Sequence, residues 1–218
     1  MYIVLLGSPG SGKGTQAKII SNQYNIPHIS AGDLLRFIVY KNKEKYKDIN
    51  NIMKKGQLVN NSLIISMVVR RLLKSDCCNG FILDGFPRSI NQAIFFKKYF
   101  GSSIYLVLEL LTLNEIIFDR VKGRLIHPIS GRIYNTKFFP PINKGIDDFT
   151  GEKLIRRNDD NEETLLKRLM LYYKNNILLS SFYNRQNLSG RIIYYRIYGN
   201  GNVYDINKIL KSIINSYL

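Results

Sequence analysis

The sequence predicts an α/β fold in which helices cover both faces of a five-stranded parallel sheet. Two observations predict it. Short apolar segments that suit buried strands alternate with longer segments of helical periodicity along most of the chain. The strand-like segments are continuous apolar runs, as is typical of parallel strands buried on both faces. The chain has 218 residues, 45% of them hydrophobic, so it can form one core domain with insertions.

The expected elements follow one another in a regular order. The strands are predicted over residues 2–6, 27–30, 81–83, 104–109 and 191–197. The helices are predicted over residues 13–24, 33–40, 62–74, 89–99, 114–122, 162–187 and 203–216. Two stretches break this alternation. Residues 41–60 are polar, rich in Lys and suited to short helices, whereas residues 123–160 hold Gly, Pro and Asp clusters between short apolar runs. The second stretch therefore predicts a compact β-type insertion.

A glycine-rich motif, Gly-Ser-Pro-Gly-Ser-Gly-Lys-Gly-Thr, covers residues 7–15, between the first strand and the first helix. Glycines allow several backbone N–H groups to turn toward one anion, and the helix N-terminus adds a partial positive charge. Lys13 is expected to reach the β- and γ-phosphates of a nucleotide. The residue after this lysine is Gly14, where most such loops have Ser or Thr, and Thr15 follows one position later. This displacement disfavours a generic GTPase.

A second motif, Asp84-Gly85-Phe86-Pro87-Arg88, begins where the third strand ends. Open α/β sheets bind ligands at the carboxyl ends of their strands. Asp84 is therefore placed to hold Mg²⁺ through water, and the guanidinium of Arg88 can bind a phosphate with two hydrogen bonds.

Charge and cysteine content limit which other classes of protein the sequence allows. Lys and Arg number 32 against 16 Asp and Glu, a net charge of +16, which allows a basic nucleic-acid-binding protein as an alternative. Much of the excess is Lys scattered over faces expected to be solvated, and residues 36–74 carry ten Lys and Arg against two acidic residues. Cys77 and Cys78 are adjacent, so no disulfide is expected and each is predicted to be at least partly buried. No segment resembles a signal peptide or a membrane span.

Together the two motifs resemble those of the nucleoside monophosphate kinases, and of the adenylate kinase family in particular. The resemblance extends through GSPGSGKGTQA, SAGDLLR, GQLV, NGFILDGFPRSINQA and GRLIHPISGRIYN. It implies a P-loop core of residues 1–29, 61–122 and 161–218, a helical AMP-binding domain of residues 30–60, and a small β lid of residues 123–160. The lid matches the long-form bacterial enzymes. The implied reaction is reversible phosphoryl transfer from MgATP to AMP.

The resemblance also assigns residues to the AMP site. Arg36, Arg88, Arg157 and Arg168 would hold the AMP phosphate or bridge toward it. Gln92 would recognise adenine, because its amide has one donor group and one acceptor group. Ala31 stands where Thr or Ser is common, which removes a hydroxyl contact. The rest of the implied AMP site consists of Gln57, Leu58, Val59, Gly85, Phe86 and Pro87.

The ATP site implied by the resemblance is formed by the phosphate loop and the lid. Its loop residues are Gly10, Ser11, Gly12, Lys13, Gly14 and Thr15. Arg124 would contact ATP, Ile133 and Tyr134 would cover its base, and the Gly201 carbonyl would meet its adenine. Arg120 would assist at the transferring phosphoryl group. The four-residue spacing of Arg120 and Arg124 predicts one face of a single helix.

Two further expectations concern metals and other ligands. Mg²⁺ is the expected cofactor, near Asp84. The lid positions that bind zinc in some relatives are His127, Ser130, Asp147 and Thr150 here, which predicts a hydrogen-bond network without zinc. His28 is expected to be an ordinary packed or exposed histidine. The protein is expected to be a cytoplasmic monomer that binds no membrane and no specific nucleic acid. A related kinase with another donor or acceptor base remains an alternative.

Overall fold

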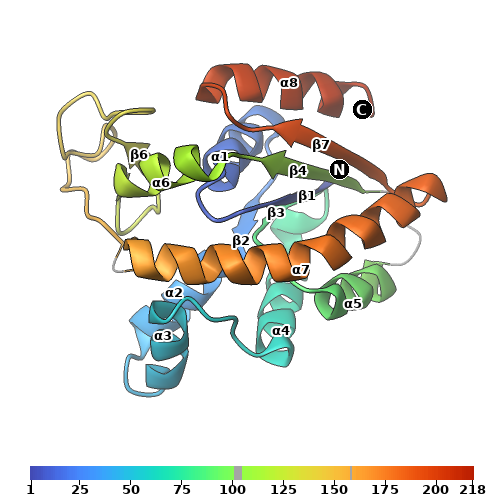
Figure 1. Cartoon of the computed structure of the whole chain (residues 1–218), viewed down its shortest axis with the longest axis horizontal. Helices are drawn as coiled ribbons and strands as arrows, with labels where there is room; N and C mark the ends of the chain where they lie inside the picture. The colour runs from blue at the N-terminus through green and yellow to red at the C-terminus, as the bar shows by residue number, and fades with distance from the viewer. Residues whose placement is uncertain (101–104, 158) are drawn as a thin grey trace.

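The fold is an α/β structure around a parallel sheet, as the sequence predicts (Figure 1). The computed structural model describes residues 1–100, 105–157 and 159–218. Within them the sheet has five strands in the order β2-β3-β1-β4-β7. These strands are β1 (Tyr2–Gly7), β2 (His28–Ser30), β3 (Phe81–Asp84), β4 (Leu106–Leu111) and β7 (Ile193–Tyr198). The order places the β1 carboxyl end, which leads into the phosphate loop, at the centre of the sheet.

The helices lie close to their predicted positions. They are α1 (Lys13–Tyr24), α2 (Ala31–Lys41), α3 (Lys47–Lys54), α4 (Asn61–Leu72), α5 (Ile90–Phe100), α6 (Asn114–Lys122), α7 (Glu162–Leu188) and α8 (Val203–Asn215), with a 3₁₀ turn, η1 (Ser75–Cys77), before β3. Strand β4 begins at Leu106 and continues two residues beyond Glu109. Ile104, the predicted first residue of this strand, lies outside the described residues.

Residues of one strand alternate between two cores, as the two-residue period of a strand requires. Ile3 and Leu5 of β1 belong to the cluster formed with α1 and α8. Val4 and Leu6 belong to the larger cluster on the other face, formed with α2, α4, α5 and α7. Figure 1 shows α8 on one side of the sheet and α7 running across the other. The sheet is therefore the middle of three layers, and its carboxyl edge stays open for a site.

The 123–160 insertion, called the lid segment below, begins with a small antiparallel hairpin. Strand β5 (Arg124–Ile126) pairs with β6 (Ile133–Asn135). Helix α6 ends at Lys122 with Gly123 as its C-cap, where a Cβ would be 2.7 Å from Thr136 Oγ1. The prediction that Arg120 and Arg124 share one helix face is therefore wrong: one lies on α6 and the other on β5.

Two smaller findings complete the fold. Cys77 is buried and Cys78 is exposed, and both are free thiols, so the prediction of partial burial is wrong for Cys78. Among the described residues, no helix has both the length and the apolar character needed to cross a membrane.

Candidate active site

The phosphate loop encloses the amino group of Lys13. Lys13 Nζ donates hydrogen bonds to the carbonyl oxygens of Gly7 and Ser8, each at 2.6 Å, and to Ser11 Oγ at 3.2 Å. Gly10 and Gly12 have φ angles of 81° and 97°, in the left-handed region that favours glycine. Burial lowers the pKa of Lys13 to about 8, although the carboxylate of Asp84 opposes the shift. The loop thus presents a poorly solvated cation beside the N-terminus of α1, which suits an anion.

Asp84 lies at the carboxyl end of β3, next to this loop. Its Oδ2 is 3.3 Å from His28 Nε2 and 3.3 Å from the position that a Cβ at Gly14 would occupy. Burial by itself would raise the pKa of Asp84, but His28 and Lys13 outweigh burial and lower it. The carboxylate is therefore ionised, and its hard oxygens beside Gly14 suit a magnesium ion held through water. His28 is packed, as expected, but it lies against Asp84, a neighbour that no sequence motif indicated.

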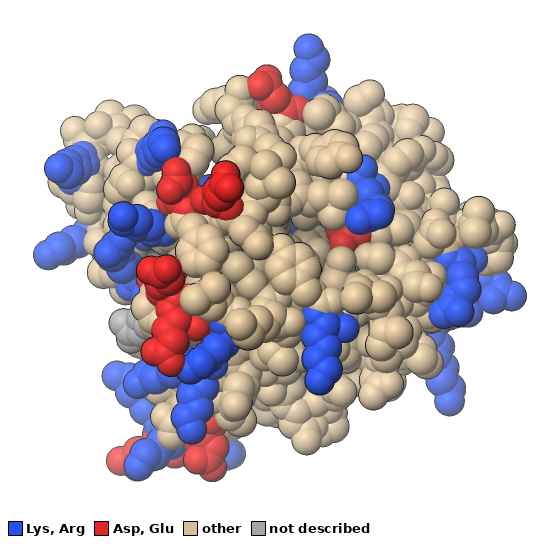
Figure 2. Space-filling model, viewed as in Figure 1, with Lys and Arg blue, Asp and Glu red and all other residues tan. Residues whose placement is uncertain are grey.

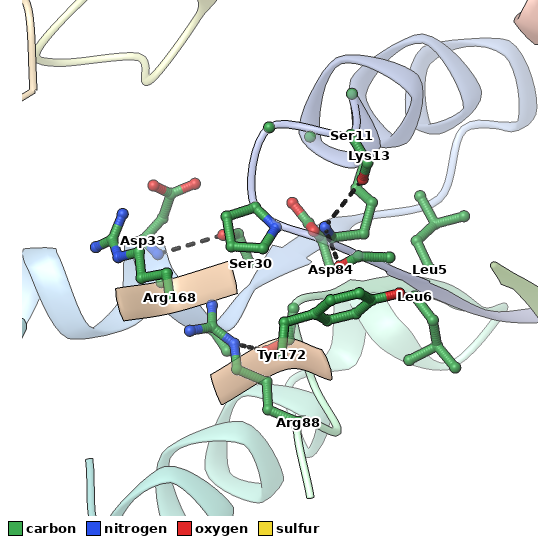
Figure 3. Close-up of a pocket in the computed structure, with 18 of the residues that line it drawn as sticks. Leu5, Leu6, Ser11, Lys13, Ser30, Asp33, Asp84, Arg88, Arg168 and Tyr172 are labelled. Carbon is green, nitrogen blue, oxygen red and sulfur yellow. Dashed lines mark hydrogen bonds between the residues drawn. The ribbon is translucent and has the colours of Figure 1, made fainter. Parts of the chain in front are cut away.

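These groups border a cavity of about 280 Å³ at the carboxyl edge of the sheet. It is lined by residues from the phosphate loop, α2, the loop after β3, the lid segment and α7. Figure 3 shows Lys13 and Asp84 together at the phosphate loop, with Arg88 and Arg168 approaching from other elements. All seven predicted catalytic residues line this cavity, namely Lys13, Asp84, Arg88, Arg120, Arg124, Arg157 and Arg168.

Three cavity arginines make hydrogen bonds to an aspartate. Arg36 donates to Asp33 from Nε at 3.1 Å and from Nη2 at 2.6 Å. Arg124 donates hydrogen bonds from two nitrogens to the buried carboxylate of Asp160, one of them from Nε to Oδ2 at 2.6 Å. Arg168 pairs with Asp159. Each pair orients a guanidinium with a charge-assisted hydrogen bond while leaving some of its five N–H donors free.

The other three cavity arginines have no hydrogen bond to a carboxylate among the described residues, although Arg157 Nη2 lies 3.8 Å from Asp33 Oδ1. Arg88 Nε donates to the Gly85 carbonyl at 2.7 Å, and surrounding protein and the nearby Arg168 lower its pKa. Its side chain is nevertheless reached by solvent through the cavity. Burial and neighbouring arginines lower the pKa of Arg157 to about 10, and its buried Nε has no hydrogen-bond partner among the described residues. An anion in the cavity would relieve this repulsion and supply the missing acceptor.

Arg120 joins two distant parts of the chain at the opposite end of the cavity. Its Nη1 donates to the Ser11 carbonyl at 3.1 Å and its Nη2 to the Gly201 carbonyl at 3.0 Å. The guanidinium also lies over the ring of Phe138. The Gly201 carbonyl is therefore already bonded to Arg120, and Gly201 does not line the cavity. Its predicted contact with a nucleotide base stays a prediction.

Most of the other predicted binding residues also border the cavity. On the side of α2 and α5 these are Ala31, Arg36, Gln57, Leu58, Val59, Gly85, Pro87 and Gln92. On the lid side Ile133 and Tyr134 do so, and Ile133 Cδ1 lies 3.2 Å from the Cβ position of Gly14. Phe86, like Gly201, does not line the cavity. Its side chain is 1% exposed within the large core cluster, where it packs edge-on against Phe96, and its predicted place in the binding site stays a prediction.

The four lid positions that correspond to zinc ligands form a hydrogen-bond network. His127 Nδ1 lies 2.7 Å from Ser130 Oγ, and Thr150 Oγ1 donates to Asp147 Oδ2 at 3.0 Å. Arg132 also donates to both carboxylate oxygens of Asp147. The predicted network is present, and among the described residues no group of His, Cys, Asp and Glu has the arrangement of a metal site.

The structure adds cavity residues that the sequence motifs did not indicate. Tyr172 and Asn176 of α7 line the cavity and donate to Glu109 Oε1 at 3.2 Å and 2.7 Å. Glu109 is fully buried on β4 and also accepts bonds from Ser180 and Tyr194. One signal was visible in the sequence: an acidic residue inside a buried apolar strand requires several donors. The sequence did not show which residues those donors are, because they lie on other elements.

Comparisons with known proteins agree with this geometry. The family model described as adenylate kinase matches residues 5–188. An adenylate kinase of Buchnera aphidicola subsp. Schizaphis graminum is 44% identical over 214 residues, which cover 98% of this chain and 100% of that protein. The adenylate kinase of Buchnera aphidicola subsp. Acyrthosiphon pisum (strain Tuc7) is 45% identical over 215 residues, covering 98% and 99%. That of Blochmanniella pennsylvanica is 44% identical over 216 residues, covering 98% and 97%. Nothing in these matches supports the nucleic-acid alternative.

Proposed function

The chain belongs to the adenylate kinase family and transfers a phosphoryl group reversibly between ATP and AMP, and we propose that the cavity at the carboxyl edge of the sheet is where it does so. One observation carries this assignment. Lys13 and six arginines from four separate parts of the chain line a single cavity that the phosphate loop borders. Phosphoryl transfer requires such convergent cations, because negative charge spreads over the equatorial oxygens of the transferred group.

The donor nucleotide would occupy the phosphate-loop side of this cavity. Backbone N–H groups of residues 10–15 and the ammonium of Lys13 would surround the β- and γ-phosphates. To reach them, Lys13 exchanges its bonds to the Gly7 and Ser8 carbonyls for bonds to phosphate oxygens. Arg120 and Arg124 would contact the donor, with Ile133 and Tyr134 of the lid segment over its base.

The acceptor would occupy the side formed by α2, α5 and residues 57–59. Arg36, Arg88 and Arg157 converge there on space that suits a phosphate dianion. Gln92 would bind adenine beside Leu58 and Val59. Arg168, which lies near both Arg88 and Asp159, would bridge the two nucleotides.

The transfer itself needs no general base. An oxygen of the AMP phosphate, already ionised, forms a new bond to the γ-phosphorus, while the bond from that phosphorus to the β,γ-bridging oxygen breaks. The bridging oxygen keeps the electron pair, so both products are ADP. The arginines hold the two reacting oxygens in line and stabilise the charge that spreads over the transferred group.

The residues around Asp84 fit the magnesium ion that such a reaction uses. Asp84 would hold Mg²⁺ through water, with Thr15 on the adjacent turn of α1. When bound, the ion would neutralise charge on the β- and γ-phosphates. The pairing of Asp84 with His28 and its lowered pKa keep the carboxylate ionised and oriented for this task.

Residues 30–60 would act as the AMP-binding domain and the lid segment as the cover over ATP. Their closure over the core would exclude water, so that the phosphoryl group goes to AMP and is not lost to hydrolysis. We expect lid opening to limit turnover. Stopped-flow measurements in which chemistry is far slower than lid motion would contradict this expectation.

A coupled assay tests the function and the choice of bases together. ATP, GTP and CTP serve as donors, and AMP, GMP, UMP and CMP as acceptors. ATP with AMP is expected to be the best pair. Absence of AMP phosphorylation would contradict the proposal, and a comparable rate with another acceptor would assign the chain to a related kinase activity.

Arg88→Ala tests the assignment of residues. We expect kcat to fall by at least about 10²-fold, because a preorganised cation at the transferred group is lost. Arg191→Ala is the matched control, since Arg191 is exposed and away from the cavity. Thermal unfolding should show that both variants fold. A folded Arg88→Ala enzyme with normal kcat would remove Arg88 from the site.

We also propose that the protein is a cytoplasmic monomer with no specific nucleic-acid ligand. The two free thiols support a reducing compartment. On the face seen in Figure 2, basic side chains are spread over several elements with acidic ones among them, and they form no single basic patch. Light scattering after size exclusion tests the first part, and nucleic-acid binding with a steep salt dependence at physiological salt would contradict the second.

A further inference from the structure

The amide of Gln92 is held at both ends by the protein. Gln92 lies in the first turn of α5, is 2% exposed and lines the cavity. Its Oε1 accepts a hydrogen bond from the backbone N–H of Arg88 at 2.7 Å. Its Nε2 donates to Oδ1 of Asn61 at 2.7 Å. Asn61 is the first residue of α4 and does not line the cavity itself. Any effect of Asn61 on a bound base therefore passes through Gln92.

The orientation of the Gln92 amide is set by a backbone donor, which cannot be reversed. The N–H of Arg88 can only donate, so an oxygen of the Gln92 amide must face it. At the other end, the backbone N–H of Gln92 donates to Ser89 Oγ at 3.4 Å, and Ser89 Oγ donates to Asn61 Oδ1 at 3.4 Å. With the Gln92 oxygen held at Arg88, the Gln92 NH₂ faces Asn61, so Asn61 turns its oxygen toward Gln92. If the Gln92 amide were flipped, its NH₂ would face the N–H of Arg88 and its oxygen would face the oxygen of Asn61.

The bonds that remain available to Gln92 match only one kind of purine edge. An amide oxygen has two lone pairs and an amide nitrogen has two hydrogens, so one acceptor and one donor remain for a base in the cavity. Adenine has a donor at N6 and an acceptor at N1, which complement them. A 6-oxopurine has an acceptor at O6 and a donor at N1, and so it requires the flipped amide. A site with fixed polar groups rejects such an analogue because buried groups are left unpaired.

We propose that Asn61 is a positioning residue that sets the preference of this enzyme for 6-aminopurine over 6-oxopurine monophosphates. It does so by holding the Gln92 amide in the orientation that complements adenine. This inference rests on the proposed function, because it requires AMP to bind against Gln92. It assigns to Asn61 no contact with the substrate and no direct part in phosphoryl transfer.

The test compares AMP with inosine monophosphate, which differs at position 6 and N1 and has no other substituent changed. With ATP as donor, the kcat/KM ratio of AMP to inosine monophosphate is measured for wild type and Asn61→Ala. We expect this ratio to fall about tenfold and the KM for AMP to rise, with kcat for AMP much less affected, because Gln92 loses one of its two anchors. If Asn61 had a merely structural role, its loss would change kcat/KM for AMP and for inosine monophosphate by the same factor, and their ratio would stay that of wild type.

Three further variants complete the design. Asn61→Asp keeps an acceptor toward Gln92 Nε2 and should restore the ratio. Asn61→Ser replaces the Ala variant if that variant does not fold, because serine suits a helix start. Its side chain is too short to reach Gln92, so the AMP-to-inosine-monophosphate ratio should again fall about tenfold. Asn60→Ala is the matched control: Asn60 Oδ1 accepts from the Ser62 backbone N–H at the same helix end, without a bond to Gln92. Its ratio should equal that of wild type.

The outcomes separate the two proposals. If the wild-type protein does not phosphorylate AMP, the proposed function fails. If it phosphorylates AMP, but folded Asn61→Ala or Asn61→Ser keeps the wild-type ratio, the function stands and the inference about Asn61 is overturned. A fall in the ratio for Asn60→Ala as large as for Asn61→Ala would also overturn it, because the effect would then belong to the end of α4.

Discussion

The two insertions of this protein are attached to the same core by different forces. Residues 30–60 are attached by apolar packing: Leu35 and Val59 are buried in the large core cluster, with Ile38, Ile52 and Met53 packed against it. The lid segment contributes to none of the core clusters of the described residues. Its buried side chains are largely polar, namely His127, Asn135, Asp147 and Asp159, with Tyr134 and Leu154. One insertion is thus held by non-directional contacts and the other by directional ones.

The contacts between the lid segment and the core are also polar. Lys18 of α1 donates to the Gly131 carbonyl, Arg156 donates to the Lys122 carbonyl, and Asn135 Nδ2 donates to the Arg120 carbonyl at 2.7 Å. Water can replace each of these partners when the contact opens, so the net free energy of each bond is about 1 kcal/mol. Apolar surface has no such replacement. The difference predicts that the lid segment opens easily as one unit, while α2 remains tied to the core.

The largest effect on stability is expected from Leu35→Ala. Leu35 is 5% exposed in the large core cluster, and its truncation should lower the free energy of unfolding by about 2–5 kcal/mol. Urea unfolding measures this change. Tyr40→Ala, on the same helix but 78% exposed, should change it by no more than about 0.5 kcal/mol. Equal effects of the two variants would show that α2 is not held by apolar burial.

Asp147→Asn should disorder the lid segment without unfolding the core. The Asp147 carboxylate accepts bonds from Arg132, Tyr134 and the backbone N–H of Thr150, and an amide cannot accept both bonds from Arg132. We expect faster proteolysis within the lid segment and a higher KM for ATP, with the main unfolding transition nearly unchanged. Asp148→Asn keeps the acceptor for the Ile142 backbone N–H and should behave as wild type. Loss of the main transition in Asp147→Asn would contradict the separation of the two regions.

The pH dependence of the lid segment tests the same carboxylate. The hydrogen bonds from Arg132 above all hold the pKa of Asp147 well below its ordinary value. A carboxyl group with a lowered folded-state pKa stabilises the fold above its unfolded pKa and loses that contribution as pH falls through the folded one. The part of lid order that depends on Asp147 should therefore persist at pH 4 and vanish only in stronger acid. Proteolysis with an acid-active protease measures it. Lid cleavage that rises between pH 5 and 4 in wild type, but not in Asp147→Asn, would contradict this prediction.

A smaller effect is expected from Lys18→Met, which removes one bond between α1 and the lid segment. Closure should weaken by about 1 kcal/mol, roughly fivefold in the closure equilibrium. The chain has no Trp, so a single tryptophan introduced at Ile142, which is 84% exposed, can report closure by fluorescence. Lys208→Met, on an exposed part of α8, is the control.

Lys18 also predicts how closure depends on pH. Burial chiefly lowers the pKa of Lys18 to about 8, whereas a solvated lysine titrates near 10.4. The closed state therefore binds fewer protons between these values, and closure should strengthen as pH rises from 8 toward 10. Lys18→Met should lose this part of the dependence. An identical pH profile in wild type and variant would show that Lys18 is equally solvated in both states.

Much of the fold follows from local patterns in the sequence. The bounds of α1 and α6 agree with the prediction at both ends, because helical periodicity and the flanking glycines are local signals. The phosphate loop and Asp84 were also predictable, since their motifs adjoin strands. Arg124 was assigned to a helix face from its spacing to Arg120, whereas it lies on β5, whose pairing with β6 a local pattern does not show. The burial of the Phe86 side chain was not predictable, because a motif does not show which of its side chains points into the core.

The sequence by itself determined the order of elements, the phosphate loop and the set of cations from which the site is made. Only the tertiary structure decided which cations carry an aspartate partner, that His28 meets Asp84, that the buried Glu109 draws its donors from α7 and β7, and how the Gln92 amide is turned. The physical reason is the separation along the chain between the residues that interact. Helix and strand periodicity arises between residues a few positions apart, whereas the His28–Asp84, Gln92–Asn61 and Glu109 hydrogen bonds join residues 31 to 85 positions apart. Their partners are set by how the layers pack.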